Sequence, residues 1–141
     1  MLIHTLKSLL AAVGAGLLLT AAAPARAADP GIGDSTITLG MSAPFSGPNG
    51  AYGKEMREGA LAYFAQINGA GGINGKKVEL ITLDDGYETD KTVANTRKLL
   101  EENKVFALMA YYGSSPTTEA MKLFSEAKTP LLGTIKIGRA H

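Results

Sequence analysis

The chain has 141 residues, of which 45% are hydrophobic and 19% charged, with a formal net charge of +1. This is an ordinary globular composition. It has no cysteine, which excludes a disulfide framework, a thiol nucleophile and a cysteine metal site. Between residues 28 and 136, 11 basic residues stand against 13 acidic ones, and the lack of a basic patch argues against nucleic acid as a partner.

The first 27 residues have the three-part pattern of a secretory signal peptide. Lys7 is the only charged residue among the first seven, residues 9–20 form an uninterrupted apolar run, and small residues end at Ala27. The run is shorter than the roughly 18 apolar residues of a membrane-spanning helix. We therefore expect cleavage after Ala27 and export to the periplasm. A mature start at Ala28 offers no cysteine for lipid attachment, so we expect a soluble product.

The mature part begins with a strand, a loop and a long amphipathic helix. Residues 36–41 alternate polar and apolar side chains, which predicts a strand, and the Pro, Gly, Ser and Asn content of residues 42–52 predicts a loop. Apolar residues then recur at helical spacing. We expect one buried helix face to contain Tyr52, Met56, Ala60, Tyr63, Phe64 and Ile67. The helix is expected to end at Asn68-Gly69, a favourable carboxyl-terminal cap.

Two further helices and three further strands follow. Strands are expected at residues 78–83, at residues 105–109 and from residue 131; the middle one is apolar enough to be buried on both faces. A helix is predicted for residues 90–102, with Thr89 or Asp90 as its N-cap. Another is predicted to begin at Pro116, which suits a first helical turn. Its buried face is expected to contain Ala120, Leu123, Phe124 and Ala127.

The regular alternation of strand and helix predicts an α/β fold with a parallel sheet flanked by helices. In such sheets, ligands bind at the carboxyl ends of the strands, where the strand order reverses. The loops expected to carry a site are therefore residues 42–53, 84–89 and 110–116.

The last five residues, Ile137–His141, match one translated frame of a widely used sequencing adapter. We therefore expect read-through into library sequence and a natural chain that continues past Lys136, with a genuine short tail as the alternative. This interpretation divides the chain into a signal peptide (1–27), a trusted body (28–136) and a non-native tail (137–141).

A series of short motifs covers residues 36–134 in a specific order. The motifs are Pro44-x-Ser46-Gly47, Ala51-Tyr52-Gly53, Gly59, the run from Ile67 to Gly75, Asp84-Asp85, Gly113-Ser114-Ser115 and Thr129-Pro130-Leu131. Together they resemble the leucine/isoleucine/valine-binding family of periplasmic solute-binding proteins of ABC transporters. The resemblance implies a class I periplasmic-binding-protein-like lobe, here incomplete, with residues 28–136 as the first part of the N-terminal lobe. It also implies a monomeric, two-lobed clamshell that closes on a small solute and docks on an ABC permease in the inner membrane.

The resemblance also implies particular ligand contacts. Ser114 corresponds to a residue that hydrogen-bonds a ligand carboxylate, and Tyr52 to a residue that lines the side-chain pocket. Ser114 precedes a predicted helix, whose first N–H groups and dipole favour an anion. Either Ser114 or Ser115 could instead cap that helix, and Tyr52 could be a core residue of its own helix. Tyr112, Ser115 and Thr117 complete the predicted ligand-binding residues, and one of Tyr111 and Tyr112 is expected to face the cleft.

The remaining motifs point away from catalysis. Gly69–Gly75 follows a helix and opens a strand, the reverse of a dinucleotide-binding loop, so we interpret it as a turn. Asp84 and Asp85 are adjacent in a strand and point to opposite faces, so we interpret them as turn and packing carboxylates. Residues 28–136 contain no cysteine, no histidine and no nucleophile elbow. We therefore expect a binding protein without cofactor or metal rather than an enzyme.

The identity of the ligand stays open at this point. We expect an amino acid or a similar small carboxylate or amide, and a second ligand loop near residues 134–137. A ligand-sensing domain of a receptor or regulator with the same fold is the alternative to transport. Residues 28–136 alone are expected to be marginally stable and not to bind an amino acid measurably, because the rest of the lobe and the partner lobe are missing.

Overall fold

The computed structural model describes residues 29–135, which form alternating strands and helices. The elements are β1 (Thr36–Ala43), α1 (Gly50–Gly69), β2 (Lys77–Asp84), α2 (Thr89–Glu101), β3 (Ala107–Met109), α3 (Ser114–Glu126) and β4 (Leu131–Leu132). The predicted order of strands and helices is confirmed. The predicted signal peptide (1–27) and the proposed non-native tail (137–141) lie outside the described residues.

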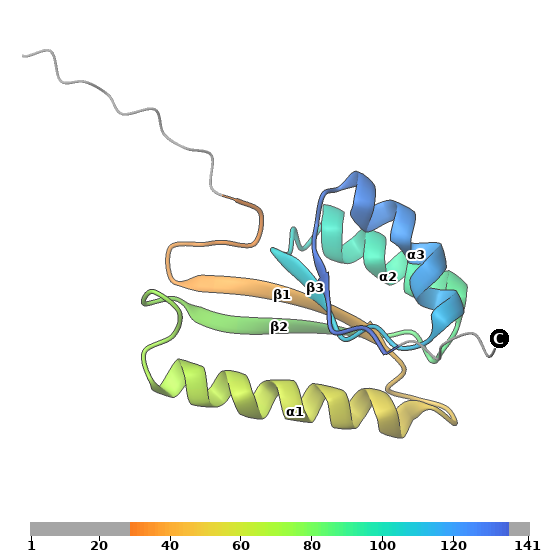
Figure 1. The fold of residues 1–141 in the computed structure, drawn as a ribbon, viewed down its shortest axis with the longest axis horizontal. Coiled ribbons are helices and arrows are strands. Elements are labelled where there is room, and N and C mark those ends of the chain that lie inside the picture. The colour runs from red at the N-terminus through yellow and green to blue at the C-terminus, as the bar shows by residue number, and fades with distance from the viewer. Residues whose placement is uncertain (1–28, 136–141) are drawn as a thin grey trace, which may run out of the picture.

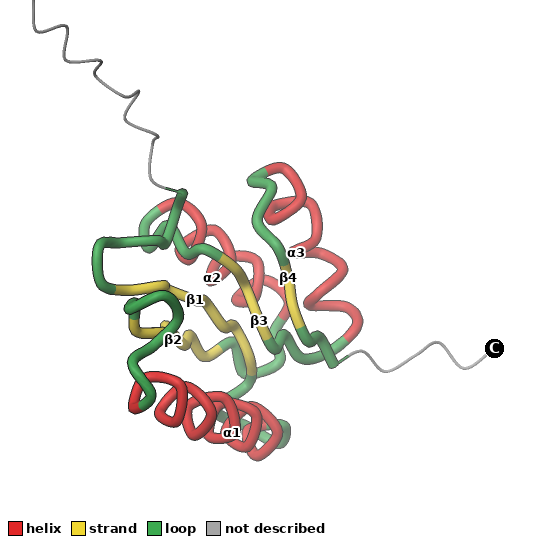
Figure 2. The backbone as a smooth tube through the Cα atoms, turned by 60° about the vertical axis from the view of Figure 1, so that its left-hand side comes forward, coloured by secondary structure: helices red, strands yellow, loops and turns green. Residues whose placement is uncertain are grey.

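The four strands form one parallel sheet in the order β2-β1-β3-β4. β1 and β2 pair along their whole length, from Thr36 opposite Lys77 to Ala43 opposite Asp84. α1 covers one face of the sheet, and α2 and α3 lie together on the other (Figure 1). Right-handed crossovers require this arrangement, because the chain moves from β1 to β2 in one direction and then returns past β1 to β3. Figure 2 shows β4 beside β3 at the edge of the sheet. The predicted parallel α/β fold is confirmed.

Apolar side chains on the two faces of the sheet form two buried clusters. On the face covered by α2 and α3, Leu99, Leu108 and Phe124 are buried together. On the other face, Met41 and Ala43 of β1 pack with Met56 of α1. Neighbouring strand residues supply the two clusters because successive strand side chains point to opposite faces.

α1 differs from its prediction in its buried face and in its end. Tyr52 and Tyr63 are 53% and 62% exposed, because at about 100° per residue they lie at one edge of the apolar stripe. The helix runs through Gly69, and the left-handed conformation expected at a cap falls at Gly71 and Gly72 instead. Within residues 29–135, no helix is both long and apolar enough to cross a membrane.

α2 and α3 begin earlier than predicted. The N-cap of α2 is Glu88, so the prediction of Thr89 or Asp90 as cap is wrong by one or two residues. The N-cap of α3 is Gly113, and Pro116 is the third residue of the helix rather than the first. Proline fits there because the first N–H groups of a helix have no intrahelical acceptor. At the far end of α3, Ala127 is the C-cap and is exposed rather than buried.

Candidate ligand-binding site at the carboxyl edge of the sheet

Three tyrosines from three different parts of the chain meet at the carboxyl edge of the sheet. Tyr52 lies in the first turn of α1, Tyr87 in the connection from β2 to α2, and Tyr112 after β3. The rings of Tyr52 and Tyr112 are stacked, with centroids 5.1 Å apart and planes 14° apart. The ring centroids of Tyr87 and Tyr112 are 5.6 Å apart, and the two ring planes are inclined at 59°. These three residues, called the tyrosine cluster below, lie where the strand order reverses between β1 and β3, the usual position of a ligand site in such sheets.

Tyr112 enters the cluster because the chain changes direction on both sides of it. Ala110 and Gly113 both have positive φ, 53° and 97°, and a non-glycine residue rarely adopts this conformation. As a result Tyr111 points into the core, fully buried, and its hydroxyl lies 2.8 Å from that of Thr96. Tyr112 instead packs between the other two tyrosines and is only 9% exposed. Of the two tyrosines considered for the cleft, the structure places Tyr112 at the site edge and Tyr111 in the core.

Tyr52 and Tyr87 form the accessible part of the tyrosine cluster, with 53% and 38% of their surfaces exposed. The alternative prediction that Tyr52 is a core residue of its helix is wrong for that reason. Burial, followed by the neighbouring phenols of Tyr52 and Tyr87, raises the pKa of Tyr112 above its usual value. The cluster therefore offers accessible aromatic surface through Tyr52 and Tyr87, packed on the buried ring of Tyr112.

The amino terminus of α3 follows Tyr112 closely in the sequence and supplies the polar groups of the candidate site. Ser114 is half-buried and Ser115 exposed, and they are the first two residues of α3. Neither occupies the N-cap position, so the prediction that one of them caps the helix is wrong. Thr117 is buried and donates its hydroxyl to the Gly113 carbonyl at 2.6 Å, within the first turn. The Thr117 hydroxyl is thus engaged with the backbone at the start of its own helix.

The segment after β4 reaches the same edge of the sheet. The N–H of Gly113 donates to the carbonyl of Ile135, and the N–H of Ile135 donates to the carbonyl of Tyr111, each at 2.9 Å. This parallel pairing extends the sheet beyond β4 and directs the chain toward the start of α3. Residues 136 and 137 of the predicted second ligand loop lie outside the described residues.

Two adjacent carboxylates hold the loops behind the site. Asp84 accepts hydrogen bonds from the N–H groups of Phe45 and Gly86, at 2.8 and 2.9 Å, and so ties the loop after β1 to the loop after β2. Partial burial by itself acts to raise the pKa of Asp84, but these hydrogen bonds, with one from the Ser46 hydroxyl, hold it below its usual value. Asp84 therefore acts as the predicted turn carboxylate.

Asp85 is buried and holds the backbone of Tyr87 by a hydrogen bond. It accepts the hydroxyl of Ser42 at 2.8 Å and the N–H of Tyr87 at 2.9 Å. Burial raises the pKa of Asp85, and these hydrogen bonds offset only part of that effect. The predicted packing role of Asp85 is confirmed, and its position explains how Tyr87 is held in the left-handed conformation, with φ of 68°.

Tyr87 is the site residue that motif comparison missed. Its loop, residues 84–89, was expected to carry part of the site because it follows a strand. Nothing in the local sequence showed that the ring would turn toward Tyr112. That orientation depends on Asp85 being buried against Ser42 of β1 and on the close approach of Gly113 from the other side of the fold.

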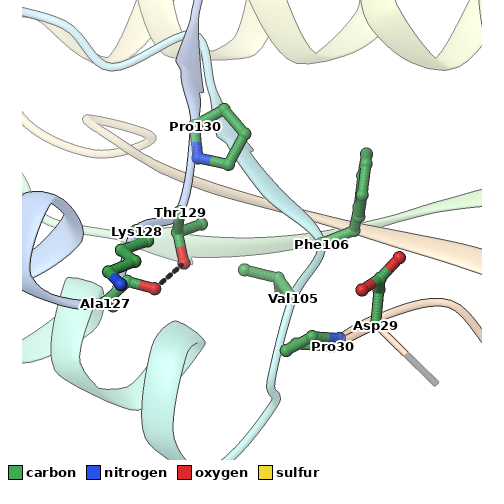
Figure 3. Close-up of a pocket in the computed structure, with 8 residues that line it drawn as sticks. All are labelled: Asp29, Pro30, Val105, Phe106, Ala127, Lys128, Thr129 and Pro130. Atoms are coloured by element: carbon green, nitrogen blue, oxygen red, sulfur yellow. Dashed lines mark hydrogen bonds between the residues drawn. The ribbon is translucent and has the colours of Figure 1, made fainter. Parts of the chain in front are cut away.

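A shallow pocket of about 430 Å³ lies at the opposite, amino edge of the sheet (Figure 3). Its lining comprises Asp29, Pro30, Val105, Phe106 and residues 127–130. In Figure 3 the side chains of Phe106 and Pro130 point up toward α1, and the one interaction drawn joins Thr129 to the Ala127 carbonyl at 3.5 Å. Among residues 29–135, this edge does not combine aromatic rings with a helix amino terminus, as the carboxyl edge does. The carboxyl edge therefore remains the candidate site.

A parallel sheet with helices on both faces and a ligand position at its switch point is an open α/β architecture, and solved type I periplasmic binding proteins share it. Residues 36–140 match the periplasmic binding protein family, and the chain belongs to that family. An amino acid binding protein of Pseudomonas aeruginosa is 34% identical over 91 residues, which cover 64% of this chain and 24% of the relative. The chain thus spans about a quarter of the length of the curated relatives it matches.

Solved structures give the same result. A possible leucine/isoleucine/valine-binding protein from Rhodopirellula baltica is 33% identical with a TM-score of 0.69, over 78% of this chain and 29% of that one. A branched-chain amino acid transporter substrate-binding protein from Streptococcus pneumoniae, in complex with isoleucine, is 32% identical with a TM-score of 0.68, over 74% and 30%. The resemblance to the leucine/isoleucine/valine-binding proteins is therefore confirmed.

Proposed function

We propose that this chain belongs to an extracytoplasmic solute-binding protein of an ABC importer. The protein binds an amino acid or similar small carboxylate between this lobe and a second lobe, and delivers it to a permease in the inner membrane. We further propose that it is a monomeric protein of the periplasm. The observation that carries the proposal is the meeting of the α3 amino terminus and the tyrosine cluster at the switch point of the sheet.

The chemistry of this edge suits a ligand with a carboxylate and an apolar body. α3 has 13 residues, enough for its dipole and its first N–H groups to favour an anion near Ser114 and Ser115. The exposed rings of Tyr52 and Tyr87 give the apolar body an aromatic surface next to that position. A hydroxyl and backbone N–H groups would orient the carboxylate, while aromatic contact would supply most of the apolar burial.

Similarity to named transporters favours transport over sensing. Two relatives from Pseudomonas aeruginosa are named as amino acid binding proteins, and the Streptococcus pneumoniae structure belongs to a branched-chain amino acid transporter. A receptor or regulator with the same fold would need an output domain in addition to the two lobes. Sequencing the source locus through the codon of Lys136 tests this directly. A frame that continues for roughly 200–300 residues, about two domains, supports transport, whereas an appended signalling domain supports the alternative.

Ligand binding is then measured on the protein expressed from the complete reading frame. Isothermal titration with leucine, isoleucine, phenylalanine, glutamine and benzoate should find at least one ligand. Ser114→Ala should weaken it by about 10- to 100-fold, because a hydrogen bond to a charged group contributes about 1.5–3 kcal/mol. Ser125→Ala, a change at an exposed serine near the other end of α3, is the matched control and should leave the affinity unchanged. Equal affinities for both variants would contradict the carboxylate role of Ser114.

A further inference from the structure

Tyr87 occupies a conformation that the protein holds with buried contacts. Its φ of 68° is left-handed, a region that a bulky residue enters only when its surroundings require it. The requirement here is the hydrogen bond from the Tyr87 N–H to Asp85, a carboxylate that is 1% exposed and is itself fixed by Ser42. The backbone of Tyr87 is therefore tied to the core, and the direction of its ring is set by that tie.

The ring of Tyr87 lies against the backbone that leads into α3. A Cβ atom on Gly113 would stand 2.5 Å from Cε2 of Tyr87, so only glycine at position 113 leaves room for the ring there. The other side of the ring meets Tyr112 at 5.6 Å. With 38% of its surface exposed, Tyr87 thus presents an edge to solvent directly beside the N-cap of α3, where the carboxylate of a ligand would lie.

We propose that Tyr87 is a specificity-determining residue of this site, which favours a carboxylate ligand with an aromatic ring over one with a branched aliphatic side chain. This inference rests on the proposed solute-binding function. Tyr52 and Tyr87 are the two exposed members of the tyrosine cluster, and both contact the buried ring of Tyr112. Rings that meet at fixed angles accept a further ring in stacked or edge-to-face geometry, which adds to the gain from burial of apolar surface alone.

The size of the effect follows from aromatic pairing. One additional aromatic pair favours an aromatic ligand by about 2- to 10-fold in affinity over an aliphatic ligand of similar area. Tyr87→Leu keeps the apolar character and removes the ring. The ratio of the dissociation constants for leucine and phenylalanine should therefore fall by about that factor, whereas a loosened site would weaken both ligands alike.

The test uses the protein from the complete reading frame, titrated with leucine, phenylalanine and benzoate. Wild type should bind an aromatic probe more tightly than leucine, and Tyr87→Leu should lose that preference. Tyr63→Leu is the matched control, since Tyr63 lies about 16 Å from Tyr52 along the axis of α1 and is 62% exposed. Its ratio should equal that of wild type. An unchanged ratio in Tyr87→Leu, or a wild type that prefers leucine, would overturn the inference and leave the proposed function intact. A wild type that binds no carboxylate or amino acid would overturn both.

A second measurement covers the case in which Tyr87→Leu does not fold. The wild-type protein is labelled with 3-fluorotyrosine, and the resonance of Tyr87 is assigned by its loss in Tyr87→Phe, which keeps the ring. Benzoate should shift the Tyr87 resonance through its ring current and leave that of Tyr63 in place, and leucine at saturation should shift Tyr87 less. Benzoate binding without a shift of Tyr87 would contradict the inference.

Discussion

Gly53 and Gly59 lie in the same helix, α1, and their replacement by alanine should have opposite effects on stability. A Cβ atom at position 53 would stand 1.9 Å from the carbonyl oxygen of Pro44 and 2.7 Å from its carbonyl carbon. Both are backbone atoms of the loop after β1, so either this loop or α1 must move. A Cβ atom at position 59 would meet no heavy atom within 4 Å. The pair therefore separates the helical preference of alanine from its steric cost.

The magnitudes follow from these distances. Alanine is favoured over glycine inside a helix by about 1 kcal/mol, so Gly59→Ala should raise the free energy of unfolding by about 0.5–1 kcal/mol. Gly53→Ala gains the same preference but overpacks a buried position, which typically costs about 1–3 kcal/mol. Because the contact is with backbone and lies far below van der Waals distance, we expect the upper end of this range. The net result is a loss of about 2 kcal/mol.

Urea unfolding of the complete protein, followed by circular dichroism, measures both changes. Gly53→Ala should also weaken ligand binding, because a shift at the start of α1 moves Tyr52 relative to Tyr112. A Gly53→Ala protein as stable as wild type would refute the close packing of α1 against the backbone of Pro44. A clear loss in Gly59→Ala would show that the outer face of α1 is covered in the complete protein.

Three further predictions concern buried polar groups and the isolated polypeptide. Thr96 donates its hydroxyl to the Thr92 carbonyl, so Tyr111 must donate to Thr96. Thr96→Val leaves that buried donor unpaired and should lower the free energy of unfolding by about 1–3 kcal/mol. Tyr111→Phe removes the donor itself and should cost less, about 0.5–1.5 kcal/mol. The double variant should lose less than the sum of the two single losses. Because the folded-state pKa of Asp85 is raised, ionisation of Asp85 should lower the free energy of unfolding of the wild type as pH rises above the usual pKa of an aspartate. Asp85→Asn should abolish this pH-dependent loss, as measured by urea unfolding between about pH 3 and pH 6. Asp84→Asn should instead remove a loss of stability as pH falls below that value, because the folded-state pKa of Asp84 is lowered. A pH dependence unchanged in both variants would contradict these assignments. Finally, the polypeptide of residues 28–136 should unfold at low urea and bind no amino acid by calorimetry, and micromolar binding would overturn this expectation.

The sequence by itself determined the order of elements and the edge of the sheet at which a site is expected. Period-two and helical spacing specify strands and helices locally, and their alternation requires a parallel sheet. A site at the ends of the strands follows from that topology alone. The first residues of α2 and α3 were harder to predict from the sequence. Neither Glu88 nor Gly113 makes the side-chain capping hydrogen bond on which a cap motif depends.

Only the tertiary structure decided which tyrosines come together at the candidate site. Tyr111 and Tyr112 are neighbours with the same side chain, yet one is in the core and the other in the tyrosine cluster. The left-handed backbone at Ala110 makes that choice, and it is stabilised by the pairing of its N–H with Leu132 on another strand. Tyr87 likewise depends on the burial of Asp85 and on the missing side chain of Gly113. Apart from the short-range hydrogen bond from Tyr87 to Asp85, these contacts join residues that are far apart in the chain. Burial that arises only when the sheet assembles leaves no local pattern in the sequence.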